Sequence, residues 1–152
     1  SKAEKTDASL QAALSLSQAA EFVDKYPEKA AHPIAQLGRN VSGGQKQRLS
    51  IARALARTPE ILIFDDSFSA LDYKTDATLR EGLAKELPGT TKIIVAQRIS
   101  TIRNADQILV LDRGEIAGLG THDALMASCT VYREIAMSQL SEEELKKGGA
   151  SK

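Results

Sequence analysis

The chain has 152 residues, of which 42% are hydrophobic and 26% charged, and its formal net charge is zero. This length and composition fit one globular domain with its own core, and the balanced charge argues against nucleic acid or an anionic membrane as a partner. The single cysteine, Cys129, excludes an internal disulfide. The longest clearly apolar runs, Ile61–Phe64 and Ile93–Ala96, span four residues each, whereas a transmembrane helix requires about 20.

The first half of the chain predicts two helices followed by a strand. After a polar start, residues 8–25 place alanine and leucine at helical spacing, and Tyr26-Pro27 ends this helix. A second helix begins after Ser42 and extends to about Arg57. The continuous apolar run Ile61–Phe64 predicts a strand that is buried on both faces, as in parallel sheets.

The second half predicts another helix, further strands and a helical C-terminal region. These segments are a helix over 72–87, buried strands over 91–96 and 107–111, a hairpin partner over 115–119 and helix from Thr121 to about Leu145. Strands that alternate with helices predict an α/β fold with a mainly parallel sheet. Ligands bind beyond the carboxyl ends of strands in such sheets, where Asp65, Asp66 and Gln97 lie.

The start of the second helix has the chemistry of a phosphate-binding corner. The first N–H groups of a helix have no intrahelical partner, and the helix dipole adds positive potential there. Gly43 and Gly44 lack a Cβ and allow the backbone to approach a ligand closely, while Ser42 caps the helix and offers a hydroxyl. By itself this pattern is weak, because most Ser-Gly-Gly tripeptides lie in loops.

The wider sequence closely resembles the ATP-binding cassette (ABC) ATPases. The run VSGGQKQRLSIARAL resembles their signature sequence, ILIFDD their Walker B strand, SFSALD their D-loop and TKIIVAQRIS their switch strand. The run VAQRISTIRNADQILVLDRGEIAGLGTHDAL is similar to the exporter branch, which includes multidrug and lipid exporters. The resemblance extends from about Thr6 to Gln139, so it covers nearly the whole chain.

This resemblance implies that residues 1–152 form the C-terminal portion of a nucleotide-binding domain, from its helical subdomain onward. Residues 8–57 would be the helical subdomain with the signature, and 58–140 the part of the catalytic core with Walker B, D-loop and switch. Residues 141–152 would be a flexible tail. No G-x-x-x-x-G-K-[ST] motif occurs in the chain, so we expect it to lack the Walker A strand and loop and not to hydrolyse ATP alone.

The resemblance also assigns roles, with ATP and Mg²⁺ as cofactors. Asp65 would bind Mg²⁺ through a water, while Asp66 and Gln97 would be catalytic. Residues of the signature would bind ATP held by a second nucleotide-binding domain in a head-to-tail dimer; they are Ser42, Gly43, Gly44 and Gln45. Asp72 would lie in the D-loop at the dimer seam. Transmembrane domains outside this chain would place it at the cytoplasmic face of a membrane.

Two residues depart from the family's pattern. Asp66 stands where the family usually has glutamate as general base, and its carboxylate reaches roughly 1.5 Å less far. Gln97 stands where the family usually has histidine, and an amide neither titrates nor carries positive charge. Together they predict a degenerate site that binds ATP but hydrolyses it slowly. Because the signature is intact, we expect a heterodimer in which this chain completes the partner's competent site.

Several alternatives remain beside this interpretation. The chain fits a non-enzymatic fragment that docks on a partner nucleotide-binding domain and regulates it, or a gene fragment without a role of its own. A soluble ABC ATPase of DNA repair or translation is disfavoured by the exporter-like match from Val95 to Leu125. Asp72 also suits a helix N-cap. The basic residues Lys46, Arg48, Arg53 and Arg57 fit a solvated helix face or interdomain contacts better than nucleic-acid binding.

Overall fold

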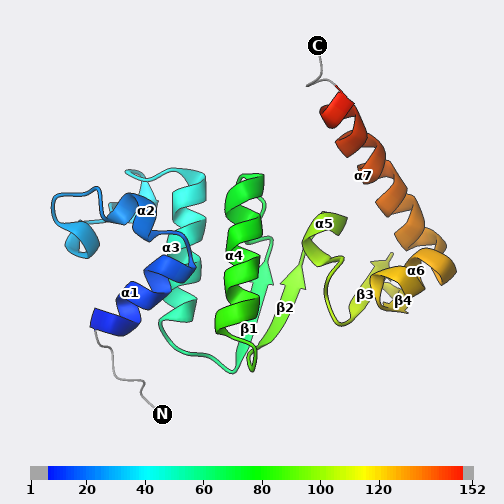
Figure 1. The fold of residues 1–152 in the computed structure, drawn as a ribbon, viewed down its shortest axis with the longest axis horizontal. Helices are drawn as coiled ribbons and strands as arrows, with labels where there is room; N and C mark the ends of the chain where they lie inside the picture. The colour runs from blue at the N-terminus through cyan, green and yellow to red at the C-terminus, as the bar shows by residue number, and fades with distance from the viewer. Residues whose placement is uncertain (1–6, 149–152) are drawn as a thin grey trace. The chain divides into compact units, whose positions relative to one another are not determined.

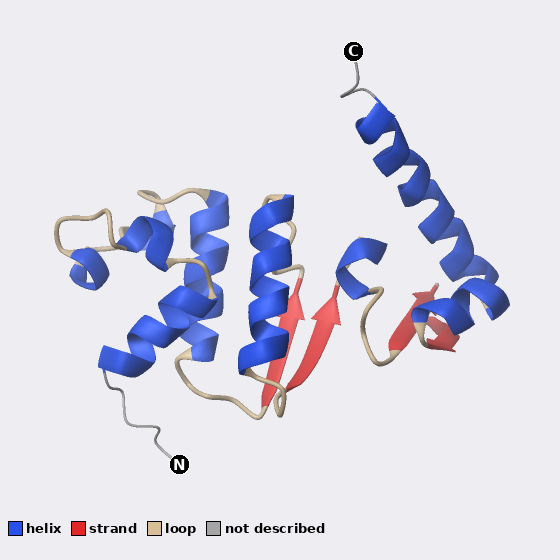
Figure 2. Ribbon diagram, in the orientation of Figure 1, coloured by secondary structure: helices blue, strands red, loops and turns tan. Residues whose placement is uncertain are grey.

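A computed structural model describes residues 7–148, with side chains through residue 139, and confirms the α/β class (Figures 1 and 2). Its elements are α1 (Asp7–Leu16), α2 (Ala20–Val23), η1 (Lys29–Ala31), η2 (Gln36–Gly38), α3 (Gly43–Leu55), β1 (Ile61–Asp65), α4 (Tyr73–Glu86), β2 (Thr91–Val95), α5 (Ile99–Ile102), β3 (Ile108–Asp112), β4 (Glu115–Gly120), α6 (His122–Ser128) and α7 (Thr130–Gly148). They form two compact units, an N-terminal unit that ends at Val95 and a C-terminal unit that begins at Ala96.

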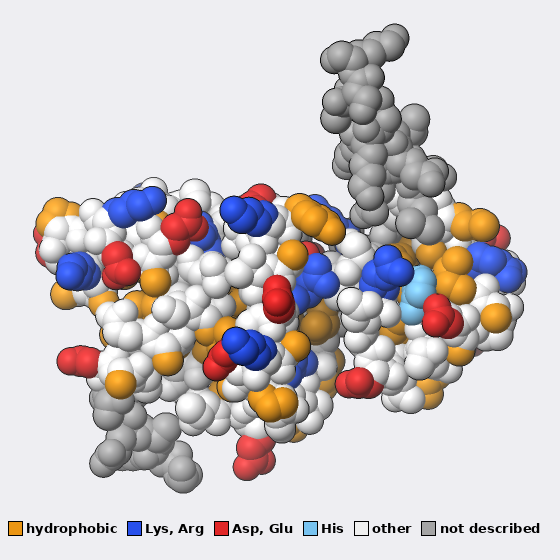
Figure 3. Space-filling model, viewed as in Figure 1, with side chains coloured by type: hydrophobic (Ala, Val, Ile, Leu, Met, Phe, Trp, Pro, Cys, Tyr) orange, Lys and Arg blue, Asp and Glu red, His pale blue; other side chains and the backbone are white. Residues whose placement is uncertain are grey.

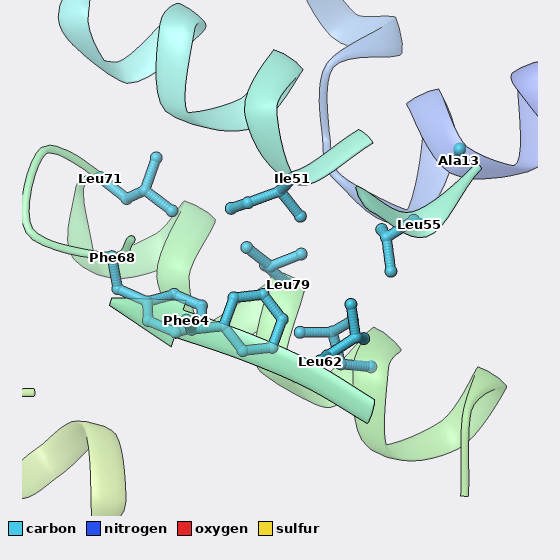
Figure 4. Close-up of a cluster of buried hydrophobic side chains, with 9 residues drawn as sticks. Ala13, Ile51, Leu55, Leu62, Phe64, Phe68, Leu71 and Leu79 are labelled. Atoms are coloured by element: carbon cyan, nitrogen blue, oxygen red, sulfur yellow. The ribbon is translucent and has the colours of Figure 1, made fainter. Parts of the chain in front are cut away.

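A single hydrophobic cluster joins α1, α3, β1 and α4 in the N-terminal unit (Figure 4). Its buried members are Ala13, Ile51, Leu55, Leu62, Phe64, Phe68, Leu71, Leu79 and Leu83. Ile51 and Leu55 extend from α3 toward Leu62 and Leu79, and Leu79 is completely buried. Because α3 and β1 share this core, the start of α3 and the end of β1 are held in one packed body.

The sheet of the N-terminal unit is buried on one face only. β1 and β2 pair in parallel, as predicted, with Ile63 opposite Ile93. Leu62 and Phe64 are buried, but Ile61 is 58% exposed and Ile63 is 68% exposed. The prediction that this strand is buried on both faces is therefore wrong, and β2 likewise leaves Ile93 and Val95 about half exposed. Successive side chains of a strand point to opposite faces, and helices of this unit cover only one of them.

The helix predicted over residues 8–25 is interrupted. α1 ends at Leu16, and Gln18 adopts a left-handed backbone with φ 60° before α2 begins. The hydroxyl of the buried Ser17 donates to the carbonyl of Leu14 at 3.1 Å and accepts from Ala19 N–H at 3.4 Å. Serine competes in this way with the helical hydrogen bonds of the backbone, which explains why an alanine-rich pattern breaks here.

Arg48 of α3 ties this interruption to the rest of the N-terminal unit. Its Nη1 donates to the carbonyl of Gln18 at 3.0 Å and to the carboxylate of Glu21 at 2.9 Å. Its guanidinium also lies 4.9 Å from the centre of the Phe22 ring, within the range of a cation–π contact. This basic side chain is thus engaged inside the unit, and acidic and basic side chains are interspersed over the visible surface of the unit (Figure 3).

The C-terminal unit contains the predicted hairpin. β3 and β4 pair antiparallel, with Asp112 opposite Glu115. Arg113 and Gly114 both have positive φ, 50° and 84°, as a tight hairpin turn between right-twisted strands requires. One face of β3 packs on α6 and α7, in a cluster that contains Ile108, Val110, Leu125, Cys129 and Tyr132.

The structure describes part of each terminus of the chain. α7 continues as helix to Gly148, within the stretch 141–152 for which the sequence predicts a tail. Residues 149–152 and the polar start over 1–6 lie outside the described residues. Within the described part, strand pairing is confined to two two-stranded sheets. Among the described residues, no helix combines the length and apolar character needed to cross a membrane.

Candidate functional site

The start of α3 is fixed by a reciprocal pair of hydrogen bonds. The Ser42 hydroxyl accepts from the Gln45 backbone N–H at 3.2 Å, and the Gln45 side-chain oxygen accepts from Ser42 N–H at 2.8 Å. This capping box confirms the predicted cap at Ser42. It also holds the Gln45 side chain against its own helix, so the first-turn N–H groups at Gly43 and Gly44 are presented in a fixed orientation.

The two glycines of this helix start differ in what lies beside them. A Cβ added to Gly44 would lie 3.1 Å from the carbonyl oxygen of Ala70, so its absence lets the loop after β1 approach α3. A Cβ added to Gly43 would meet nothing within 4 Å. No described residue therefore demands glycine at position 43, and the space beside it is open to a molecule from outside.

Two exposed carboxylates stand at the end of β1. Asp65 is the last residue of the strand, and Asp66 follows in a left-handed backbone conformation with φ 49°. The Asp66 N–H donates to the carbonyl of Val95 at 3.2 Å, which extends the pairing with β2 by one bond. Within the described residues, no cluster of three or more His, Cys, Asp or Glu could hold a metal by itself. Mg²⁺ commonly takes one or two carboxylates and completes its shell with phosphates and waters, which this pair fits.

Asp72 is the N-cap of α4, which is one of the two roles predicted for it from the sequence. Its carboxylate accepts from the Thr75 hydroxyl at 2.6 Å and from the Thr75 N–H at 3.0 Å. The Thr75 hydroxyl, followed by the Thr75 N–H, lowers the pKa of Asp72 below its ordinary value. Because the folded pKa is lowered, this contribution to stability is present above the ordinary pKa and is lost as the pH falls through the folded value.

The sequence-predicted site residues lie in both units. Ser42 to Gln45, Asp65, Asp66 and Asp72 belong to the N-terminal unit, where the approach of Gly44 to Ala70 brings the start of α3 beside the loop that carries Asp66 and Asp72. Gln97 belongs to the C-terminal unit. Its carbonyl accepts from the side-chain amide of Gln139 at 2.7 Å, and the oxygen of that amide accepts from Ile99 N–H at 2.8 Å.

Two glutamines, one in each unit, bind segments that carry predicted site residues and escape prediction from the sequence. Gln139 of α7 binds the backbone on both sides of residue 98, although it lies 42 residues from Gln97. Gln47 of α3 binds the loop after β1, across 19 to 23 residues. Neither has a local sequence signal, because glutamine on an exposed helix face usually has no long-range partner. To predict these contacts, one would need to know which helix packs beside which loop.

The profile of the ABC transporter family matches residues 3–69. The chain is 46% identical to the putative ABC transporter ATP-binding protein MG014 homolog of Mycoplasma pneumoniae, over 89% of this chain and 22% of that protein. It is 42% identical to human ATP-binding cassette sub-family B member 5, over 88% of this chain and 11% of that protein. The structure of a bacterial Atm1-family ABC exporter with ATP bound matches with a TM-score of 0.85 and 35% identity, over 90% of this chain and 24% of that chain.

The chain is part of an ABC exporter-type nucleotide-binding domain. Its α/β fold and its likeness to the solved exporter structure agree with the sequence relatives on this. The ABC exporter segment spans 22% of the Mycoplasma pneumoniae relative and 19% of a second relative, from Mycoplasma genitalium.

Proposed function

We propose that this chain, within its complete protein, forms part of the ATP-binding and ATP-hydrolysing module of an exporter. That exporter couples ATP hydrolysis to transmembrane transport. The observation that carries the proposal is the shared core of the N-terminal unit. It packs an open, capped helix start at Ser42–Gln45 and two exposed carboxylates at Asp65–Asp66 into one body. A capped helix start of this kind suits phosphate recognition, and exposed carboxylates suit magnesium binding.

The residues then divide between two nucleotides. Asp65 and Asp66 would serve the ATP bound to this protein itself, where Asp65 orients the water on Mg²⁺ and Asp66 accepts a proton from the attacking water. Mg²⁺, when bound, neutralises charge that develops on the phosphates. Gln97 would donate a hydrogen bond to the γ-phosphate of the same ATP.

The helix start of α3 would instead act on the partner's ATP. In a head-to-tail dimer, the N–H groups of Gly43 and Gly44 and the Ser42 hydroxyl would bind phosphate held by the second nucleotide-binding domain. The open space beside Gly43 supports this assignment, because no group in the described part of the chain fills it. Asp72 would lie at the seam of the dimer, and transmembrane domains would hold the assembly at the cytoplasmic face of a membrane.

We further propose that the dimer is asymmetric. Asp66 would be a general base that is one methylene short, and Gln97 would be a switch residue without positive charge. Both would slow ATP hydrolysis at this protein's own site. The intact helix start would still complete the partner's site. The assembly would therefore be a heterodimer with one hydrolysing and one ATP-retaining site.

Replacing Asp66 by asparagine tests this asymmetry. We expect the ATPase rate of the complete exporter, assembled with its partner in lipid, to change by less than about twofold, because the site that Asp66 serves contributes little turnover. The matched control replaces the general base of the partner, which should abolish most activity. A general base at a competent site contributes roughly a hundredfold or more, so a loss of that size from Asp66→Asn would contradict the asymmetric model.

The same assay distinguishes the alternative of a non-enzymatic interaction fragment. A complete protein that binds a partner nucleotide-binding domain but shows no Mg²⁺-dependent hydrolysis in the assembled state would support that alternative. The polypeptide 1–152 by itself is expected to hydrolyse no ATP under either proposal, since its sequence contains no Walker A loop.

A further inference from the structure

We propose that Gln47 is a positioning residue that locks the loop after β1 onto α3, so that the helix start and the D-loop are held as one rigid piece. This inference rests on the proposed function, because it concerns how the two ATP sites are coupled. It assigns a mechanical role to a side chain that touches neither nucleotide.

One amide group of Gln47 makes three contacts with this loop. Its Nε2 donates to the carbonyl of Asp66 and to the hydroxyl of Ser69, each at 3.3 Å. Its Oε1 accepts from the Ala70 N–H at 3.1 Å. A glutamine amide carries two N–H donors and one acceptor oxygen. Both the nitrogen and the oxygen of the Gln47 amide therefore bind a segment 19 to 23 residues away.

The Ser69 hydroxyl is both donor and acceptor in this network. The Ser69 hydroxyl donates its single proton to the carbonyl of Asp66 at 3.0 Å and is left free to accept from Gln47. The Ser69 N–H also donates to the carbonyl of Asp66 at 3.3 Å. Three groups thus hold one carbonyl, and that carbonyl belongs to the residue with the left-handed backbone. Such conformations persist where surrounding contacts determine them.

A second contact fixes the same loop to the same face of α3. Gly44 and Gln47 are three residues apart on the helix and therefore lie on one face. The space left by the missing Cβ of Gly44 is closed by the carbonyl oxygen of Ala70, at 3.1 Å from the Cβ position. The N–H of Ala70 faces Gln47, so one peptide residue of the loop is held from both directions.

This geometry has a consequence for the proposed dimer. The start of α3 would contact the partner's ATP, while the loop leads directly to Asp72 at the seam. Loosening the loop would misplace Asp72 relative to Ser42–Gln45 without removing any group that touches ATP. The rate at the partner's site should then fall while ATP binding is preserved.

The test compares variants of the complete exporter, assembled with its partner in lipid. Gln47→Met keeps the length and helix propensity of the side chain but removes all three hydrogen bonds, and Gln47→Glu keeps only the acceptor for Ala70. We expect Gln47→Met to lower kcat by about tenfold, short of the roughly hundredfold that a 1 Å misplacement can cost. KM for ATP should stay within about twofold, since binding groups are untouched. Gln11→Ala, an exposed glutamine of α1, is the matched control and should behave as wild type.

A double-variant cycle separates positioning from a general loss of structure. If Gln47 and Ser69 act through one network, Gln47→Met combined with Ser69→Ala should lower kcat no further than Gln47→Met alone. Multiplying effects, or an unchanged kcat in Gln47→Met, would overturn the proposal, and Gln47→Glu with Ser69→Ala gives the same comparison if the methionine variant does not fold. Absence of ATPase activity in the wild-type assembly would instead overturn the proposed function itself.

Discussion

Replacing Gly43 by leucine is expected to abolish most of the ATPase activity of the assembled exporter while leaving the fold of this chain unchanged. The reason is the open space at this position, where an added Cβ meets nothing within 4 Å. A leucine there would cost the chain little, but it would occupy the volume in which the partner's phosphate must approach the helix N-terminus. Loss of aligned N–H donors at a developing charge typically costs roughly a hundredfold or more in rate.

The measurement is steady-state ATP hydrolysis by the complete protein with its partner, together with its thermal unfolding temperature. Gly89→Leu is a matched control, because Gly89 is equally open and lies in the turn before β2, away from α3. Equal activity losses in the two variants would show that the effect is not specific to the helix start. Wild-type activity in Gly43→Leu would remove the basis for a trans-acting role of this segment.

The isolated polypeptide 1–152 is expected to be marginally stable and to associate rather than unfold as a cooperative monomer. One face of the β1–β2 sheet is not covered by the described residues of its unit, and Ile61, Ile63, Ile93 and Val95 are 48 to 68% exposed. Burial of apolar surface stabilises by about 25 cal/mol per Å². The folded N-terminal unit lacks this stabilisation for one whole face of its sheet. Flat apolar faces and unpaired strand edges also favour association between chains.

Sedimentation velocity and differential scanning calorimetry of the purified polypeptide check this expectation. Replacing the four exposed side chains by threonine, which keeps β propensity, should reduce association without restoring the stability of a complete domain. A purified wild-type monomer that unfolds cooperatively at a temperature typical of whole domains, about 45–65 °C, would contradict the expectation.

Features that depend on a few neighbouring residues could be predicted from the sequence. The cap at Ser42, the cap at Asp72 and the turn at Arg113-Gly114 all follow from short-range hydrogen bonds or backbone preferences. The approximate limits of α3 and α4 followed for the same reason. These local signals were enough to place the phosphate-binding corner and the two carboxylates at the ends of their elements.

Features that depend on packing could not be predicted in the same way. A continuous apolar run shows that a strand can be buried on both faces, but not how many layers cover it, and Ile63 is mostly exposed. The break at Gln18 depends on the buried hydroxyl of Ser17 and on Arg48, which is 30 residues away. The clamps by Gln47 and Gln139 likewise join segments that only the fold brings together.

The central claim is that the helix start at Ser42–Gln45 acts on ATP held by the partner. A photoreactive ATP analogue that carries its reactive group on the γ-phosphate, bound to the complete protein assembled with its proposed partner, tests this directly. We predict that it labels residues 41–45 of this chain, and that the label disappears when the Walker A lysine of the partner is replaced by alanine. Labelling that survives this replacement, but is lost when the corresponding lysine of this protein's own complete domain is replaced, would contradict the account.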